Sequence, residues 1–372
     1  MARGHGAGRR WTLVAAGVVM LLALPLVLRL WPAGDDGRSA ADLRTAVLAG
    51  ADQGWSGIAE SSGGLALPET DQLGTIADLF SDRTRMRVWW RGPEDHRIDV
   101  VTATGETDLR RTAAGRWTWD YQSDRAGWTP AAGITGFALP AATDLLPSTL
   151  TRRLLSEADD GELSRIGSAR VAGRAALGLR LVPADPGASV ARVDVWVDAE
   201  TGWLPLQVQV FDQSTGTVPA LDTRLLEVDP TAPDPAVIAF RPPPSADIRS
   251  DDPLGLLRDV ADRLPDVAFP DTLAGLPRRD VTGAPPSIGL YGRGVTLLAV
   301  IPLPGRAAAE LRRAADADPA AVHDQLGSRL TAGPIGILLT GAPRNAYLLT
   351  GTVTPETLAQ AALALPGLGS QR

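Results

Sequence analysis

The sequence contains no cysteine and no lysine, so all 36 of its basic residues are arginine. Without cysteine the chain can form no disulfide, no zinc–thiolate site, no thiol nucleophile and no lipidated cysteine anchor. Without lysine it has no P-loop lysine, no Schiff-base lysine and no Ser-x-x-Lys dyad. Histidine is scarce as well, with three among 372 residues. These absences exclude several classes of enzyme before any motif is considered.

The few remaining catalytic residue types do not form a recognisable constellation. His96 and His323 fall in different predicted domains, so a histidine triad or metal cluster is not expected. His96 is predicted to be a solvated turn residue. The acids of EADDGE (157–162) lack EF-hand spacing and indicate the end of a helix. Carboxylate pairs for glycoside chemistry stay open in principle, but no motif singles one out, and we expect no enzyme, no metal and no cofactor.

Long hydrophobic runs are also rare, and the clearest one lies at the N-terminus. Residues 11–28 carry no charge, and arginines precede and follow them. Such a run is about long enough to cross a bilayer, and the preceding arginines predict that the rest of the chain faces outward. We therefore predict a transmembrane signal anchor at residues 1–31 and a single-pass protein of the cell membrane, with its bulk extracytoplasmic. A cleaved signal peptide is the alternative.

The chain beyond this anchor is acidic, with 32 arginines against 43 acidic residues. A net charge of this sign argues against a nucleic-acid partner and against broad binding to anionic headgroups.

Alternation with a period of two dominates residues 55–229, and turn residues separate its segments. Hairpin-length connections predict a large antiparallel sheet. The predicted strands are 55–67, 83–91, 96–102, 105–112, 115–121, 125–129, 164–172, 174–182, 190–198, 203–212 and 220–229.

Three helices are expected beside this sheet, at residues 40–52, 71–81 and 145–158. The third should begin at Ser148 or Thr149 as its cap. A proline-rich stretch follows the last strand and predicts a boundary near 245–253. The main domain should therefore span 40–248.

A smaller α+β domain is expected over 253–372. Helices are predicted at 253–263 and 305–326, with a break at Pro319, and a last helix should start at Thr354. The predicted strands are 287–291, 294–301, 335–340 and 345–351.

One face of the predicted large sheet is apolar and rich in tryptophan. The simplest interpretation is an ordinary core under the helices. Three short helices cover eleven strands poorly, however, so a curved sheet around an apolar cavity also fits. We predict that this cavity takes a lipid or acyl chain. Its expected lining residues are Val88, Trp90, Trp117, Trp119, Leu179, Leu181 and Val195. The expected gate helix contributes Leu150, Leu154 and Leu155.

Two sequence blocks carry a family resemblance. Residues 87–121, RVWWRGPEDHRIDVVTATGETDLRRTAAGRWTWDY, and residues 167–213, which include VARVDVWVDAETGWLPLQVQVFDQ, resemble the LolA/LolB lipoprotein-carrier superfamily and its RseB/MucB relatives. Pro93 with Arg97, Gly115 with Trp117, and the Asp-x-x-Thr-Gly turn before Leu204-Pro205 match its pattern. FRPPPSADI (240–248) resembles the close of its domain.

This resemblance implies an incomplete antiparallel barrel with helices in its concave face. It also implies binding of acyl chains, or a sensory role through lipid or lipoprotein binding. Gly92 separates Arg91 from Pro93, which departs from the carriers. The tether and the second domain are closer to the two-domain RseB-type relatives.

The fold class expected from the sequence is thus mainly β (α+β): an anchor helix, an 11-stranded antiparallel half-barrel with helices in its concave face, and a small α+β domain. The first functional hypothesis is a membrane-tethered protein that binds a lipid or lipoprotein acyl chain. The alternative is a regulator that binds a membrane protein, such as an anti-sigma factor or an ABC transporter component, with no carrier role.

Overall fold

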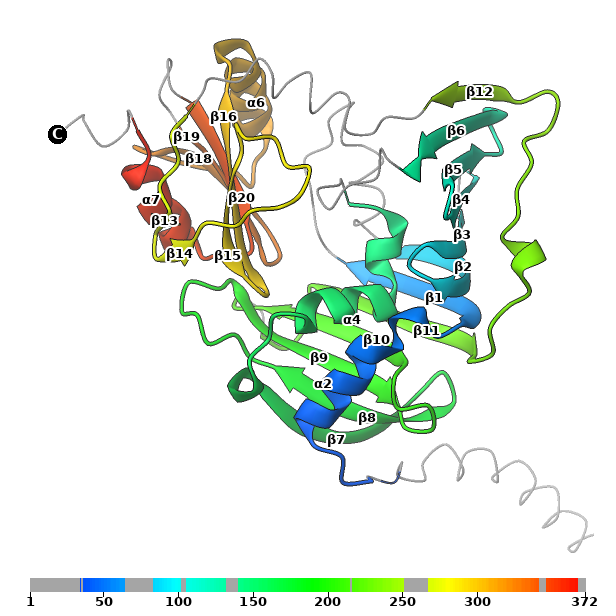
Figure 1. Ribbon diagram of the computed structural model, residues 1–372. Coiled ribbons are helices and arrows are strands. Elements are labelled where there is room, and N and C mark those ends of the chain that lie inside the picture. Colours follow the sequence, from blue (N-terminus) through cyan, green and yellow to red (C-terminus); the bar gives the residue numbers. More distant parts are fainter. Residues whose placement is uncertain are drawn as a thin grey trace, which may run out of the picture.

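The computed structural model describes residues 34, 36–63, 83–101, 105–131, 140–214, 216–250, 267–340 and 346–366. The predicted anchor at 1–31 and the predicted helices at 71–81 and 253–263 lie outside these residues. Among the described helices, none has both the length and the apolar character needed to cross a membrane. A large sheet with helices α2 and α4, and a smaller sheet with helices α6 and α7, make up the described fold (Figure 1).

The large sheet has twelve described strands in the order β12-β6-β5-β4-β3-β2-β1-β11-β10-β9-β8-β7. Their bounds are β1 (Trp55–Gly63), β2 (Arg83–Gly92), β3 (Asp95–Val101), β4 (Glu106–Thr112), β5 (Gly115–Asp120), β6 (Arg125–Pro130), β7 (Leu163–Val171), β8 (Arg174–Leu181), β9 (Val190–Asp198), β10 (Pro205–Asp212), β11 (Leu221–Asp229) and β12 (Asp247–Ser250). The two edge strands, β12 and β7, do not pair with each other, so the described sheet is not a closed barrel.

Eleven of these strands lie where the period of two predicted them, and they pair antiparallel. Strand β12 corrects the predicted count and the all-antiparallel sheet, because it pairs parallel with β6. Its four residues are all exposed, so they show no alternation that could have marked a strand. The chain reaches β12 after crossing the sheet in the proline-rich stretch 230–246 (Figure 1).

We call the face of the large sheet that carries α2 (Ala40–Ala49) and α4 (Pro147–Leu155) the inner face. In Figure 1 both helices lie over the half of the sheet formed by β7–β11. Leu43 and Val47 of α2 and Leu155 of α4 are buried in one apolar cluster with the sheet. Burial of such side chains contributes roughly 1.5–3 kcal/mol each. The core of this domain therefore lies between the inner face and these two helices.

The opposite face, which we call the outer face, is ionic. Strands β8 and β9 are joined there by Arg180, which donates two hydrogen bonds to Asp194 at 2.6 and 2.7 Å. Arg174 binds Asp198 in the same way, at 2.8 and 3.0 Å. Paired nitrogens of this kind match a carboxylate in geometry as well as charge. The arginines of the strands thus serve cross-strand pairing.

Helix α4 starts differently from the prediction. Its first residue is Pro147, its N-cap is Leu146, and no side chain caps it. Ser148 and Thr149, predicted as caps, lie inside the helix. A proline at the first helical position supplies the required φ and lacks the N–H that a cap would satisfy, which explains the earlier start. At the other end, Arg44 of α2 donates to the carbonyl oxygens of Leu155 and Ser156.

The smaller domain contains six paired strands in the order β15-β16-β20-β19-β18-β17. Its elements are β15 (Gly289–Arg293), β16 (Thr296–Leu303), α6 (Gly305–Ala317), β17 (Val322–Asp324), β18 (Gly327–Ala332), β19 (Ile335–Thr340), β20 (Ala346–Gly351) and α7 (Pro355–Ala364), with the short pair β13 (Thr272–Leu273) and β14 (Leu276–Pro277).

Four of its strands were missed, namely β13, β14, β17 and β18. The predicted helix 305–326 ends at Ala317 and gives way to β17. The break at Pro319 ends the helix rather than bending it. Thr354 caps α7 as predicted, and its side chain accepts a hydrogen bond from Thr357 N–H.

Candidate functional site

The candidate ligand site lies between α4 and the inner face. Five of the predicted lining residues are together there, each at most 2% exposed. They are Val88, Trp90, Leu179, Leu181 and Val195. Leu155 is fully buried above them, while Leu150 and Leu154 are partly buried against the same cluster. The structure therefore brings the gate helix onto the predicted apolar residues, and α2 and α4 fill the space above these five side chains.

Trp117 and Trp119 do not belong to this site. Trp90 pairs with His96, His96 with Arg111, and Arg111 with Arg116 across successive strands. The inner-face position on β5 is therefore Arg116, and its neighbour Trp117 points to the outer face. The expectation that all seven residues line one surface was wrong, because alternation within a strand does not say which set faces inward.

On the outer face these tryptophans pack under the proline-rich stretch. Trp117 lies 4.8 Å from Trp128 and 5.7 Å from Phe240, measured between ring centroids, and Trp119 lies 6.0 Å from Phe240. Arg110 donates to the carbonyl oxygen of Ala239 at 2.9 Å. The second aromatic group of this domain thus holds the stretch that leads to β12.

The buried side of α4 is not purely apolar. Ser148 and Thr151 are 2% and 0% exposed, and neither hydroxyl has a hydrogen-bond partner in the described part of the chain. The Thr149 hydroxyl is likewise buried without one. A buried polar group without a partner costs about 1–3 kcal/mol. The contact between α4 and the sheet is therefore weaker than its leucines alone would make it.

The inner face changes character near β2–β4. His96, predicted to be a solvated turn residue, lies on β3, is 7% exposed and stacks on Trp90 with ring centroids 4.6 Å apart. Burial lowers the pKa of His96 to about 4, and Arg111 acts in the same direction. The ring is thus neutral at physiological pH, with Nδ1 3.1 Å from the carbonyl oxygen of Gly92.

The outer face holds a buried acidic pair, Asp99 and Asp108, on neighbouring strands. Their carboxylates and that of Glu106 lie within 4.8 Å of one another, close enough to hold a metal ion. Arginines already occupy the space between them: Arg97 binds Asp99 at 2.6 and 2.8 Å, and Arg110 binds Asp108 at 2.8 Å. Burial raises the pKa of Asp99 to about 6, with Asp108 adding to the effect. We interpret the cluster as an ion-pair network.

Glu157, just beyond α4, joins the two domains. Its carboxylate accepts two hydrogen bonds from Arg279 at 2.7 and 2.8 Å and one from Gly294 N–H at 2.6 Å. These bonds lower the pKa of Glu157. Val295, in the same turn between β15 and β16, is 7% exposed and belongs to the apolar cluster of the large sheet. We call the Glu157, Arg279 and Gly294 contacts the clasp.

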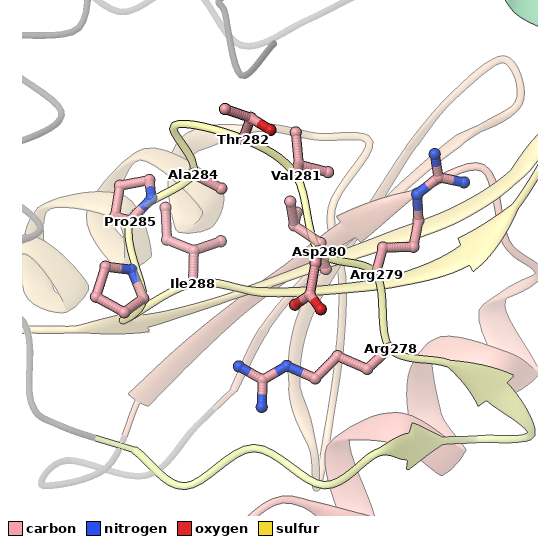
Figure 2. A pocket seen from close by; sticks show the side chains of 10 residues that line it. Arg278, Arg279, Asp280, Val281, Thr282, Ala284, Pro285 and Ile288 are labelled. Carbon is pink, nitrogen blue, oxygen red and sulfur yellow. The ribbon is translucent and has the colours of Figure 1, made fainter. Parts of the chain in front are cut away.

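A cavity of about 230 Å³ lies next to the clasp in the smaller domain. Figure 2 shows it beneath the loop that runs from Arg278 to Ile288, with the Arg279 side chain extending away from Arg278 and Asp280. Because Arg279 is already bound to Glu157, the polar groups left to this cavity are chiefly Arg278 and Asp280. The cavity is small and its loop is held in place by the clasp.

No protein-family model matches the sequence, and no curated protein matches it. Among solved structures, the MucA/MucB complex of Pseudomonas aeruginosa is similar at 16% identity, with 87% of this chain and 96% of that chain covered and a TM-score of 0.47. A LolA superfamily protein from Nitrosomonas europaea is similar at 10% identity, with coverages of 55% and 99% and a TM-score of 0.24.

A putative outer membrane lipoprotein-sorting protein domain from Vibrio parahaemolyticus is similar at 13% identity, with coverages of 51% and 90% and a TM-score of 0.22. The resemblance to LolA-like and RseB/MucB-like proteins found in the sequence is thus found again among structures. None of the three bears the name of an enzyme. At these identities the likeness concerns the fold.

Sequence reasoning missed the roles of His96 and Glu157. Glu157 was read only as an acid at the end of a helix, and its partner lies 122 residues away in sequence. His96 follows the turn residues Pro93 and Glu94, which hid its place on the inner face. Its even spacing from Ile98 and Val100 is the signal that could have identified it.

We predict that His96→Gln changes how stability depends on pH. Because the folded pKa is about 4 and the unfolded value about 6.5, His96 makes the wild type lose stability as pH falls from 6.5 to 4. Asp99, whose folded pKa is raised, acts in the opposite direction below about 6. The variant should therefore gain up to about 3 kcal/mol relative to the wild type across this range, measured by urea unfolding. His323→Gln is the control. If the free energy of unfolding depended on pH in H96Q as it does in the wild type, His96 would not be buried as a neutral ring.

We predict that Glu157→Gln loosens the clasp. Glu157 is partly exposed, so its loss should weaken the contact by no more than about 1 kcal/mol. Hydrogen exchange at Gly294 N–H should become about fivefold faster, and added salt should reduce the difference from the wild type. Glu200→Gln removes an exposed partner of Arg174 away from the clasp and should leave that exchange rate unchanged. Equal protection of Gly294 in both variants would show that Glu157 does not hold the domains.

Proposed function

We propose that this chain binds the acyl chain of a lipid or lipoprotein between α4 and the inner face of the large sheet. The observation that carries the proposal is the contrast between the two sides of this contact. The sheet offers a continuous apolar surface, whereas α4 meets it with Leu155 and with hydroxyls that have no partner among the described residues. Such a helix can be exchanged for a more apolar occupant.

The magnitudes favour such an exchange. Displacing α4 removes the burial of Leu155 and part of that of Leu150 and Leu154, roughly 1.5–3 kcal/mol for each fully buried side chain. An acyl chain gains about 0.8 kcal/mol per buried methylene, so about ten methylenes gain roughly 8 kcal/mol. Release of the buried hydroxyls to water adds to that gain. An acyl chain of ordinary length can therefore compete with the helix.

The proposed setting is the outer side of a cell membrane, to which the N-terminal hydrophobic run would tether the chain. An apolar ligand extracted from a bilayer would then need to travel only a short distance. The acidic chain beyond residue 31 makes a nucleic-acid partner unsuitable.

The alternative is a regulator that binds a membrane-protein partner, such as an anti-sigma factor or a transporter component. MucB, one of the similar proteins, was crystallised with MucA. The clasp allows acyl-chain binding and partner binding to be coupled, because Glu157 binds the smaller domain from the end of α4. Movement of α4 would then change how the two domains are held together, and native mass spectrometry of the protein extracted from its membrane would show whether it carries a lipid or a protein.

We predict that Thr151→Val weakens binding of a fluorescent long-chain fatty acid. The change keeps the shape but removes a buried hydroxyl without a partner, so it should stabilise the closed site by about 1 kcal/mol. A ligand that must displace α4 then binds about fivefold more weakly. Thr45→Val, on the exposed side of α2, is the matched control. A T151V protein that is more stable yet binds the probe as well as the wild type would refute displacement of α4.

We predict that a disulfide between the domains also weakens uptake of this probe. Ala188 and Val353 face each other in an antiparallel bridge, a geometry that accepts a disulfide. In the double variant Ala188→Cys, Val353→Cys these would be the chain's only cysteines. If α4 can move only when the clasp yields, the oxidised form should bind more weakly than the reduced form. If the oxidised and reduced forms bound the probe with equal affinity, ligand uptake would not depend on movement at the domain contact.

A further inference from the structure

The inner face becomes polar at β2–β4, beside the apolar site. One residue from each strand forms a row across the sheet: Trp90, His96, Arg111 and then Arg116 on β5. Neighbouring strands are about 4.8 Å apart, so Arg111 lies two strand spacings from Trp90. The row begins in the apolar cluster, which contains Trp90, and ends among arginines.

Arg111 is only partly satisfied in this row. The residue is 8% exposed, and one terminal nitrogen, Nη2, donates to Oε1 of Glu94 at 3.2 Å. The other, Nη1, is buried with no acceptor in the described ranges. Glu94 itself is largely exposed, and its ion pair with Nη2 leaves Nη1 of Arg111 without a partner.

A second arginine approaches the row from α4. The Arg152 guanidinium lies 5.5 Å from the ring centroid of Trp90. Within the described residues it has neither a hydrogen bond nor a salt bridge, and Asp52 is the one acidic group that stabilises its charge. Burial lowers the pKa of Arg152. Ser148, one helical turn earlier on the same side of α4, has the buried hydroxyl without a partner described above.

Nη1 of Arg111 is a buried donor without an acceptor, the half-buried Arg152 guanidinium offers donors only, and the Ser148 hydroxyl can donate as well. A carboxylate or phosphate oxygen is an acceptor with negative charge, and guanidinium groups bind such oxygens strongly. A cation or a neutral donor would find no free acceptor on these side chains. The side chains at this end of the site are therefore suited to bind an anion.

We propose that Arg111 and Arg152 form an anion-binding subsite for the acidic headgroup of an amphiphile, a carboxylate or a phosphate. This inference rests on the proposed function, because it places the headgroup at the polar end of the site whose apolar part takes the chain. His96 and Trp90 lie along the row between the apolar cluster and Arg111, and they give the ligand a flat, uncharged wall. The substrate class is therefore an anionic single-chain lipid, or a lipid with an exposed phosphate.

The test compares three probes with the same hydrocarbon chain on the full-length protein: hexadecanoic acid, hexadecyl phosphate and hexadecanol, each competing with a fluorescent fatty acid. We expect at least one of the two anions to bind more tightly than the alcohol. Arg111→Gln and Arg152→Gln should each reduce that preference by about tenfold to a hundredfold, and should change alcohol binding little. The two anion arms distinguish a fatty-acid carboxylate from a phosphate headgroup.

Arg153→Gln is the matched control. Its side chain is 65% exposed on the same helix and pairs with Asp144, away from the row. Arg111→Lys and Arg152→Lys should keep part of the preference, and thermal melting checks that each variant is folded. An alcohol that binds as tightly as both anions, or a preference unchanged in both glutamine variants, would overturn the subsite while leaving acyl binding intact. If no probe binds, including the alcohol, the proposed function fails as well.

Discussion

Strand β1 lies between β2 and β11, and these two pairings make one sheet out of two halves that are distant in the sequence. The pairing is close: a Cβ at Gly57 would collide with the carbonyl oxygen of Glu227. A bulge between Ile58 and Ala59 shifts the register with β11, whereas the pairing with β2 is regular. If β11 did not return to β1, the chain would form two smaller sheets. The candidate site would then lose Val88 and Trp90, which β2 contributes from the other half of the sheet.

The continuous sheet separates apolar from charged side chains, and this separation sets the positions of the candidate site and of the supporting network. On the outer face, each buried aspartate is bound by an arginine of the same or a neighbouring strand. The ion pairs offset the free-energy cost of burying the carboxylates. The absence of lysine therefore has a structural consequence, because guanidinium groups bind carboxylates through two parallel hydrogen bonds. The inner face, free of such pairs over β8–β10, is left to apolar contacts.

The sequence allowed the strands to be predicted better than the faces. Period-two alternation located eleven strands, since each is half-buried and the alternation is local. It could not assign Trp117 to a face, because that depends on the register with β4 and β6. Strand β12 and the clasp depend on partners far away in the chain. Five of seven predicted lining residues came together because they share the core, whereas Arg111 and Arg152 were hidden by the expectation that arginines are exposed.

Helix α4 is where these constraints meet. Its leucines lie on the inner face, Arg44 of α2 holds its last carbonyl oxygens, and Glu157 just after it holds the smaller domain. Its buried hydroxyls have no hydrogen-bond partner among the described residues. Its Arg152 guanidinium lies against the Trp90 ring, with Asp52 as the one acidic group that stabilises its charge. A ligand whose chain replaces the leucine contacts would release the buried hydroxyls to water, and its anionic group would supply an acceptor for Arg152. The same ligand would shift the helix end to which the clasp is attached, so a change in the apolar site would also alter the contact between the domains.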